Sequence, residues 1–326
     1  MTLLNERRTL HLVDPEVAPP LDYFPPFNLS PATLAPVREL LASMPTPADP
    51  AALFPDVVRS EHLIPGRDDD PDVGIIVYRP RSVAASAPAL VWMHGGGFVL
   101  GAAQDDDLAC HGYADGAGAV VVSVDYRLAP ETPAPGPLND CYAALSWTFA
   151  HAEELGIDPD RIAVGGASAG GGLAACLAIL ARDLGEIPVC FQLLAYPMLD
   201  DRTASSSEAG PYQGEFVWEP GDNRFGWSSY LGRSPGGDDV TAHEAAARVA
   251  TTEGLPPAYI AVGSVDLFAE EDLTYAQRLI RAGVPVELHV YPGGYHGFVM
   301  AAQARITQAY RRDLAAALAR ALETKD

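Results

Sequence analysis

A serine lies between two glycines where a predicted strand meets a predicted helix. The segment Gly166-Ala-Ser-Ala-Gly170 follows the apolar run 161–165 and precedes the helical stretch 173–180. In a G-x-S-x-G elbow the serine occupies a strained strand-to-helix turn, and the flanking glycines let neighbouring backbone pass close enough for its Oγ to stand exposed. This context predicts that Ser168 is a catalytic nucleophile.

A nucleophilic serine needs a base that takes its proton and an acid that orients the base. His296 follows the apolar run 286–291, and Asp266 follows the run 258–262, so both lie just after predicted strands. Open α/β sheets place their ligands at the carboxyl ends of strands. We therefore predict His296 as the general base and Asp266 as the orienting acid. Three neighbouring carboxylates are alternatives for the acid: Glu270, Glu271 and Asp272.

A second glycine run, His94-Gly-Gly-Gly97, follows the apolar run 90–93. Glycines leave their N–H groups unshielded by side chains, as an oxyanion hole requires. The predicted donors to the oxyanion are the N–H groups of Gly96, Gly97 and Ala169. Losing one such donor costs roughly 3–4 kcal/mol of transition-state stabilisation. His94 itself is interpreted as an organiser of its loop.

Apolar runs that alternate with helix-like segments predict the framework for these residues. The expected strands are 73–78, 89–93, 119–124, 161–164, 189–195, 258–262 and 286–291. The expected helices lie near 106–117, 138–155, 169–184, 271–282 and 299–322. This alternation favours an α/β fold with a mostly parallel twisted sheet and helices on both faces.

Two segments depart from that alternation. Residues 1–60 are rich in proline, with one helix candidate opening at Ser30-Pro31, and residues 201–250 carry clustered aromatic side chains without a strand period. A long insertion in a compact domain is typically a lid or binding element. We expect both segments to form a helical cap over a catalytic core made of 61–200 and 251–326. The alternative for 201–250 is a structural surface excursion.

Aromatic and apolar side chains near the predicted triad are candidates for the substrate pocket. They are Phe98, Tyr196, Trp218, Leu267 and Phe298. Ordinary core packing is the competing interpretation for each of them.

Composition excludes several classes of function. The 326 residues are 48% hydrophobic and 20% charged, which is typical of a globular enzyme, and the formal net charge of −22 disfavours nucleic acid and anionic membrane surfaces as partners. The only lysine is Lys325, which argues against Schiff-base chemistry. The amino terminus lacks a secretory apolar region and no run is long enough to span a membrane, so we expect a cytoplasmic protein.

No pattern in the sequence predicts a metal or nucleotide site. The four cysteines lack zinc or redox spacing and are expected to be free structural thiols. The acidic runs Asp68-Asp-Asp70 and Asp105-Asp-Asp107 are interpreted as solvated or helix-capping residues. Neither a P-loop nor a dinucleotide-binding fingerprint is present.

Taken together, the motifs resemble those of the hormone-sensitive-lipase-like family of bacterial carboxylesterases, from about residue 75 onward. The residues that carry the resemblance are His94-Gly-Gly-Gly97, Asp125-Tyr-Arg-Leu-Ala-Pro-Glu131, Gly166-Ala-Ser-Ala-Gly170, Asp266-Leu and His296-Gly-Phe298. The resemblance implies an α/β-hydrolase fold, a helical cap, and hydrolysis of short- to medium-chain esters without a cofactor. It also suggests that Asp125 and Arg127 pair to brace the oxyanion loop. Ala167 departs from the family, whose members usually have Asp or Thr before the nucleophile.

The sequence therefore predicts a serine carboxylesterase that works through an acyl-enzyme intermediate on a small-molecule ester. The alternatives are a hydrolase of amides, lactones or other acyl substrates and, on the same fold, a non-catalytic small-molecule-binding protein. The natural ester, the acyl length, the stereochemical preference and the oligomeric state, with a homodimer among the possibilities, stay open at this point.

Overall fold

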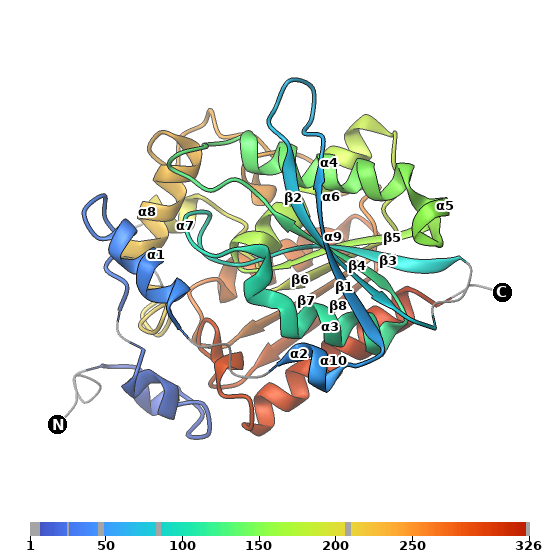
Figure 1. Cartoon of the computed structure of the whole chain (residues 1–326). Coiled ribbons are helices and arrows are strands. Elements are labelled where there is room, and N and C mark those ends of the chain that lie inside the picture. The colour runs from blue at the N-terminus through green and yellow to red at the C-terminus, as the bar shows by residue number, and fades with distance from the viewer. Residues whose placement is uncertain (1–6, 25, 45–48, 83–85, 206–209, 324–326) are drawn as a thin grey trace.

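An eight-stranded sheet runs through the centre of the molecule (Figure 1). This computed structural model describes residues 7–24, 26–44, 49–82, 86–205 and 210–323, so Lys325 lies outside the described residues. The strands are β1 (Val57–Ile64), β2 (Val73–Pro80), β3 (Ala87–Met93), β4 (Val120–Asp125), β5 (Ile157–Ala167), β6 (Phe191–Ala195), β7 (Ala258–Gly263) and β8 (Val286–Tyr291).

The strand order is β1-β2-β4-β3-β5-β6-β7-β8. The β1–β2 and β2–β4 pairs are antiparallel, and every other pair is parallel. The predicted α/β fold with a mostly parallel sheet is confirmed. The seven predicted strands are all present, and β1 is an additional edge strand that the sequence analysis did not predict.

Helices cover both faces of the sheet. They are α1 (Leu34–Ala42), α2 (Pro50–Leu53), α3 (Asp107–Ala117), α4 (Gly136–Ala150), α5 (Ala152–Leu155), α6 (Ala169–Leu184), α7 (Arg202–Ser205), α8 (Pro220–Leu231), α9 (Ala269–Arg281) and α10 (Arg305–Ala321). Short 3₁₀ helices lie at η2 (Leu10–Leu12), η3 (Pro19–Asp22), η4 (Ala103–Asp106), η5 (Ala246–Arg248) and η6 (Phe298–Met300).

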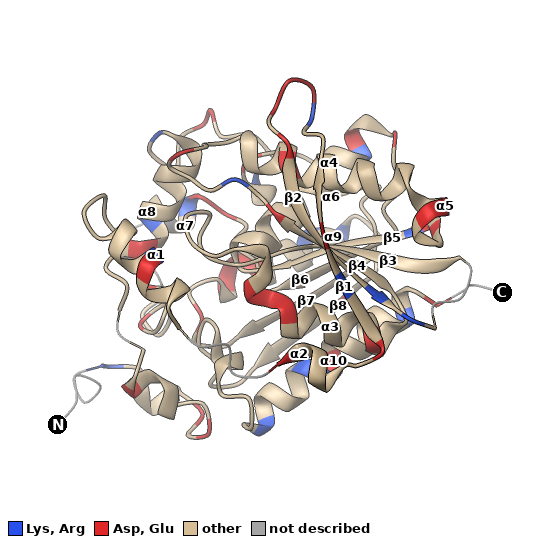
Figure 2. Cartoon of the chain, in the orientation of Figure 1, with Lys and Arg blue, Asp and Glu red and all other residues tan. Residues whose placement is uncertain are grey.

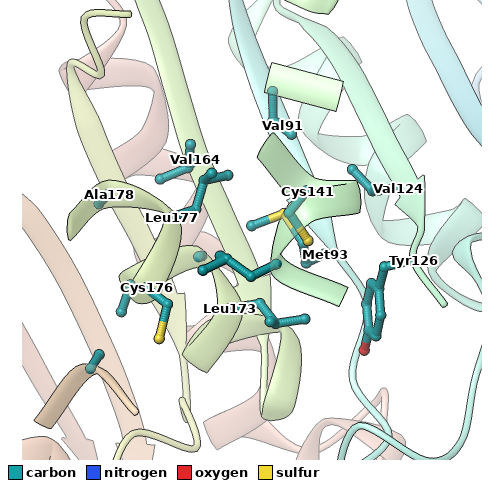
Figure 3. Packing of buried hydrophobic residues seen from close by; sticks show 14 of the residues in the cluster. Val91, Met93, Val124, Tyr126, Cys141, Val164, Leu173, Cys176, Leu177 and Ala178 are labelled. Atoms are coloured by element: carbon teal, nitrogen blue, oxygen red, sulfur yellow. The ribbon is translucent and has the colours of Figure 1, made fainter. Parts of the chain in front are cut away.

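Successive residues of a strand pack into two different hydrophobic clusters, one on each face of the sheet. In β4, Val120, Val122 and Val124 join the cluster that contains α4, α6 and α9, whereas Val121 joins the cluster that contains α3 and α10. This is the period-two pattern of a strand that is buried on both faces. Figure 3 shows side chains of α6 and α4 packed closely against Met93 and Val164 of the sheet. The sheet thus lies between two helical layers.

The amino-terminal segment lies beside the segment that connects β6 to β7. In Figure 1 the blue α1 region is next to α8, and the Leu29 backbone N–H donates to Asp222 Oδ1 at 2.6 Å. Arg7 forms an ion pair with Glu219 at 2.7 Å. A helix follows Ser30-Pro31, but it begins at Leu34 and not at Pro31: residues 31–33 form a turn in which Ser30 Oγ accepts the Thr33 N–H at 3.3 Å. No helix in the described part of the chain is long and apolar enough to cross a membrane.

Candidate active site

Ser168 stands at the sharp turn between β5 and α6. Its backbone has φ 55° and ψ −121°, a region that a residue with a side chain rarely adopts, and its N–H donates to the Ala195 carbonyl at 2.9 Å. A Cβ built on Gly170 would lie 2.2 Å from the Met93 carbonyl oxygen. Only glycine therefore fits at that position, which is the physical reason for the second glycine of the elbow.

Ser168, His296 and Asp266 form a continuous chain of hydrogen bonds. Ser168 Oγ lies 2.9 Å from His296 Nε2. His296 Nδ1 lies 2.9 Å from Asp266 Oδ2 and 3.1 Å from Asp266 Oδ1. All three side chains are buried, and the rings of Tyr196 and Phe268 meet the imidazole edge to face. Since a carboxylate only accepts, Nδ1 carries the hydrogen and Nε2 is free to accept the Ser168 proton.

The three alternative acids do not reach His296. Glu271 Oε1 accepts the Leu199 N–H at 2.7 Å, and its other oxygen accepts the Thr203 hydroxyl. Glu270 is exposed, and Asp272 is fully buried without a hydrogen-bond partner among the described residues. The structure therefore brings Asp266, and none of these carboxylates, to the imidazole.

The glycine loop lies across the mouth of the elbow. Gly96 and Gly97 have φ values of 122° and 61°, and both line one cavity with Ser168 and His296. Ala169 is the first residue of α6, where backbone N–H groups have no partner within the helix. Within the described chain, the N–H groups of Gly96, Gly97 and Ala169 donate to no backbone carbonyl. All three are thus available as donors near the serine.

The Asp125-Tyr-Arg127 segment braces this loop, but not through the predicted pair. Tyr126 stacks on the His94 ring, with centroids 4.2 Å apart, and its hydroxyl donates to the His94 carbonyl at 2.8 Å. Asp125 Oδ1 instead accepts the Ala103 N–H. Arg127 pairs with the buried Asp140 at 2.7 Å, so the expected Asp125–Arg127 pair is wrong. A guanidinium pairs preferentially where a carboxylate can meet its planar donor edge, and Asp140 offers both oxygens.

A cavity of about 360 Å³ opens onto Ser168 and His296. Two of the five predicted pocket residues, Tyr196 and Trp218, line it. The other three are not among the lining residues: Phe98 stacks on Tyr230, Leu267 packs against Gly214, and Phe298 packs against Tyr310. These three side chains are buried in the core. Ala167 does line the cavity.

The sequence analysis also missed several cavity residues. Phe24, Phe27 and Leu41 reach the cavity from the amino-terminal segment, and Asp105 and Asp106 reach it from the turn before α3. The aromatic character of residues 24–27 is a sequence signal for the first group. Asp105 does cap a turn as predicted, since it accepts the Ala102 N–H, but sequence alone does not reveal that this turn faces the serine.

Among the residues that the structure describes, no three His, Cys, Asp or Glu side chains form a cluster that could hold a metal ion. Cys110, Cys141, Cys176 and Cys190 are all free thiols, as predicted, and the first three are buried.

Comparison with known proteins gives a consistent result. The profile of a family described as "alpha/beta hydrolase fold" matches residues 90–300. Carboxylesterase NlhH of Mycobacterium tuberculosis is 38% identical over 292 residues, covering 88% of this chain and 89% of NlhH. Esterase LipI of the same species is 40% identical over 233 residues, covering 70% of this chain and 71% of LipI. A solved structure titled "Bacterial Heroin Esterase" superposes with a TM-score of 0.89 at 41% identity, covering 97% of this chain and all of that one.

Proposed function

Since this chain belongs to the hormone-sensitive-lipase-like carboxylesterases of the α/β-hydrolase fold, we propose that Ser168, His296 and Asp266 are its catalytic triad. The chain is a carboxylic ester hydrolase, as its relatives are named. The observation that carries the triad is the hydrogen-bonded series from Ser168 Oγ through the His296 ring to Asp266.

In the proposed mechanism Ser168 Oγ attacks the ester carbonyl while His296 Nε2 takes the hydroxyl proton. The carbonyl oxygen becomes an oxyanion that accepts hydrogen bonds from the N–H groups of Gly96, Gly97 and Ala169. His296 then gives its proton to the alcohol oxygen, the C–O bond breaks, and the acyl group stays on Ser168. Water attacks this acyl-enzyme in the same manner, which releases the acid and restores the serine.

Asp266 orients His296 and does not itself take the serine proton. Its two oxygens hold Nδ1–H of His296, and the Phe268 N–H donates to Oδ1 at 3.0 Å. The carboxylate fixes the imidazole tautomer and stabilises the imidazolium that forms when Nε2 takes the proton.

Short- to medium-chain esters are the proposed substrates. A cavity of about 360 Å³ is at the small end for ligand sites, and its walls include Phe24, Phe27 and Trp218. We also propose that the amino-terminal segment up to residue 60 and residues 201–250 act together as a cap, because both supply walls of this cavity. Residues 61–200 and 251–326 would then form the catalytic core.

A chain-length series of p-nitrophenyl esters, from acetate to palmitate, tests the proposal. The wild-type protein should hydrolyse the short and medium esters best, and Ser168→Ala should retain only background hydrolysis. Ser60→Ala, on edge strand β1, is a matched control that should keep wild-type rates. A phosphonate that labels serine hydrolases should add to the wild type and to Ser60→Ala but not to Ser168→Ala, as measured by intact mass. Equal rates in wild type and Ser168→Ala would rule out this nucleophile.

Additional substrates separate the esterase from the alternative hydrolases. If the protein were an amidase or a lactonase, its kcat/KM for an anilide or a lactone would exceed that for the ester of the same acyl length. The relatives' names favour esters as the better substrates.

We also propose a cytoplasmic location. All four cysteines are free thiols, three of them buried, and thiols stay reduced in the cytoplasm. Fractionation of the producing cell tests it, since recovery of the enzyme outside the cytoplasmic fraction would contradict the proposal.

A further inference from the structure

Two carboxylates share the cavity with the proposed nucleophile. Asp105 and Asp106 precede α3, and both line the cavity that also contains Ser168 and His296. Asp105 is exposed and Asp106 is partly exposed. Ester hydrolysis at Ser168 does not use either carboxylate.

These carboxylates lack the cationic partners that others nearby have. Asp107 forms an ion pair with Arg59 at 3.2 Å. Across the described residues, no arginine or histidine nitrogen lies within 4.0 Å of an Asp105 or Asp106 oxygen. Asp105 Oδ2 accepts the Ala102 N–H at 3.0 Å, and Asp106 Oδ2 accepts the Trp92 indole N–H at 2.7 Å. One oxygen of each carboxylate is thus left without a hydrogen bond from the described chain.

A third acceptor in the same cavity comes from His94. Its side chain is 1% exposed and lines the cavity. Nδ1 lies 2.7 Å from the Gly95 carbonyl oxygen, which only accepts, so Nδ1 carries the hydrogen. Burial lowers the pKa of His94, which favours the neutral ring. Nε2 is then a lone-pair acceptor, and it has no hydrogen-bond partner among the described residues.

The cavity therefore contains hydrogen-bond acceptors to which no group of the described chain donates, and one of its walls is made of aromatic side chains. Burial, helped by the neighbouring carboxylates Asp105 and Asp107, raises the pKa of Asp106, while its bond from Trp92 and the nearby His94 oppose the rise. A cation placed beside this carboxylate would offset that unfavourable burial. The rings of Phe24, Phe27 and Trp218 line the same space and suit the alkyl groups of an organic cation, including by cation–π contact.

We propose that this cavity selects carboxylic esters that carry a protonated amine, in either the acyl or the alcohol part, over their neutral isosteres. The ammonium N–H would donate to Asp106, Asp105 or His94 Nε2, while the ester carbonyl lies at Ser168. This inference rests on the proposed function of Ser168. The net charge of −22 acts in the same direction, because it attracts cationic substrates and repels anionic ones.

Matched ester pairs test the selectivity. For the alcohol part, 2-(dimethylamino)ethyl butyrate is compared with 3-methylbutyl butyrate, in which carbon replaces the nitrogen. For the acyl part, ethyl 4-(dimethylamino)butanoate is compared with ethyl 5-methylhexanoate. Released acid is measured by titration at neutral pH, and each pair gives a ratio of kcat/KM values. We expect the wild type to favour the amine by about tenfold or more in at least one pair, as a charged hydrogen bond would give.

Asp106→Asn should reduce that ratio by at least about fivefold, because the amide keeps the shape but loses the charge. A ratio within one variant does not depend on the fraction of folded protein. Asp115→Asn is the matched control: it removes one charge from an exposed position on α3 outside the cavity and should leave the ratio unchanged.

The outcomes separate this inference from the proposed function. Ratios near one in both wild-type pairs, or an equal ratio in Asp106→Asn and wild type, would overturn the amine selectivity while leaving the esterase intact. An equal effect of Asp115→Asn would assign the preference to overall charge and overturn the cavity site. Hydrolysis of the neutral esters by Ser168→Ala at the wild-type rate would instead contradict the proposed function.

Discussion

Asp266 is the residue whose contribution is easiest to isolate. Both of its oxygens lie within 3.1 Å of His296 Nδ1, so an amide in its place presents a donor or an acceptor where two acceptors now stand. Asp266→Asn should therefore favour the wrong imidazole tautomer and lower kcat by roughly 10²–10⁴-fold. Steady-state hydrolysis of p-nitrophenyl butyrate measures the change.

Glu270→Gln serves as the matched control for Asp266→Asn. Glu270 is a nearby exposed carboxylate, and its loss should leave kcat within about twofold of wild type, as for most surface substitutions. The opposite pattern, with Glu270→Gln inactive and Asp266→Asn active, would move the orienting role to Glu270.

At this residue scale the convergence of Ser168, His296 and Asp266 was predictable, and most of the residues that line the cavity were not. Ser168, Asp266 and His296 each follow an apolar strand, so topology alone brings them to one edge of the sheet. Pocket walls depend on side-chain direction, which residue type does not encode. Phe98 is the clearest example: it directly follows the glycine loop, but its φ is 67° and its ring stacks on Tyr230 in the core.

Strands were easiest to predict where burial makes their sequence a continuous apolar run. The parallel strands are buried on both faces and form continuous apolar runs, such as β3, in which every residue is buried. β1 was not predicted because it lies at the edge of the sheet and pairs only with β2. Its residues alternate irregularly between buried, half-buried and exposed, so its sequence has no regular apolar pattern. The two segments that we propose as a cap stand out by composition, but their pairing with one another depends on contacts between residues far apart in the sequence, as with Leu29 and Asp222, 193 positions apart.

This contact lets us predict how the proposed cap affects catalysis. Asp222, at the start of α8, is buried, and its Oδ1 accepts the Leu29 N–H at 2.6 Å. Asp222→Ala would leave that buried N–H without an acceptor, at a cost of about 1–3 kcal/mol. Because Phe27 and Trp218 lie beside this contact and line the cavity, we expect KM for medium-chain esters to rise at least about threefold.

Asp222→Asn distinguishes the hydrogen bond from the charge. Its amide oxygen still accepts the Leu29 N–H, so KM should stay close to wild type. If Asp222→Asn raised KM as much as Asp222→Ala, the effect would belong to the carboxylate charge and not to the bond between α8 and the amino-terminal segment.

The whole molecule carries a large excess of negative charge, spread over its elements. Figure 2 shows acidic residues in red across most of the ribbon, in keeping with 43 acidic and 21 basic side chains. Most of the arginines in the described chain form ion pairs, as with Arg127, which bridges Asp70 and Asp140. Two kinds of acid therefore make stability depend on pH: paired carboxylates such as Asp70, whose pKa is lowered in the folded protein, and buried carboxyls such as Asp272, whose pKa is raised.

Asp272 is the acid from which this dependence is most directly predicted. Its carboxyl is fully buried in α9 without a hydrogen-bond partner in the described part of the chain. Burial, together with the nearby Glu271 and Asp266 carboxylates, raises the pKa of Asp272 well above its usual range. Between its unfolded pKa of about 3.9 and this raised value, the folded state holds more protons than the unfolded state. The contribution of Asp272 to stability is therefore largest at low pH and falls as pH rises through that window.

Asp272→Asn removes this titration while keeping the side chain's size. The melting temperature of the variant relative to wild type should increase as pH rises from about 5 until the raised pKa is passed, with the free energy of unfolding diverging by at most about 1.4 kcal/mol per pH unit. Glu270→Gln, which removes an exposed carboxylate two residues earlier, should give a curve parallel to wild type. Thermal unfolding monitored by circular dichroism across this pH range decides between them. If Asp272→Asn also ran parallel to wild type, the buried carboxyl would have no raised pKa, and the pH dependence of stability would have to come from the surface charges.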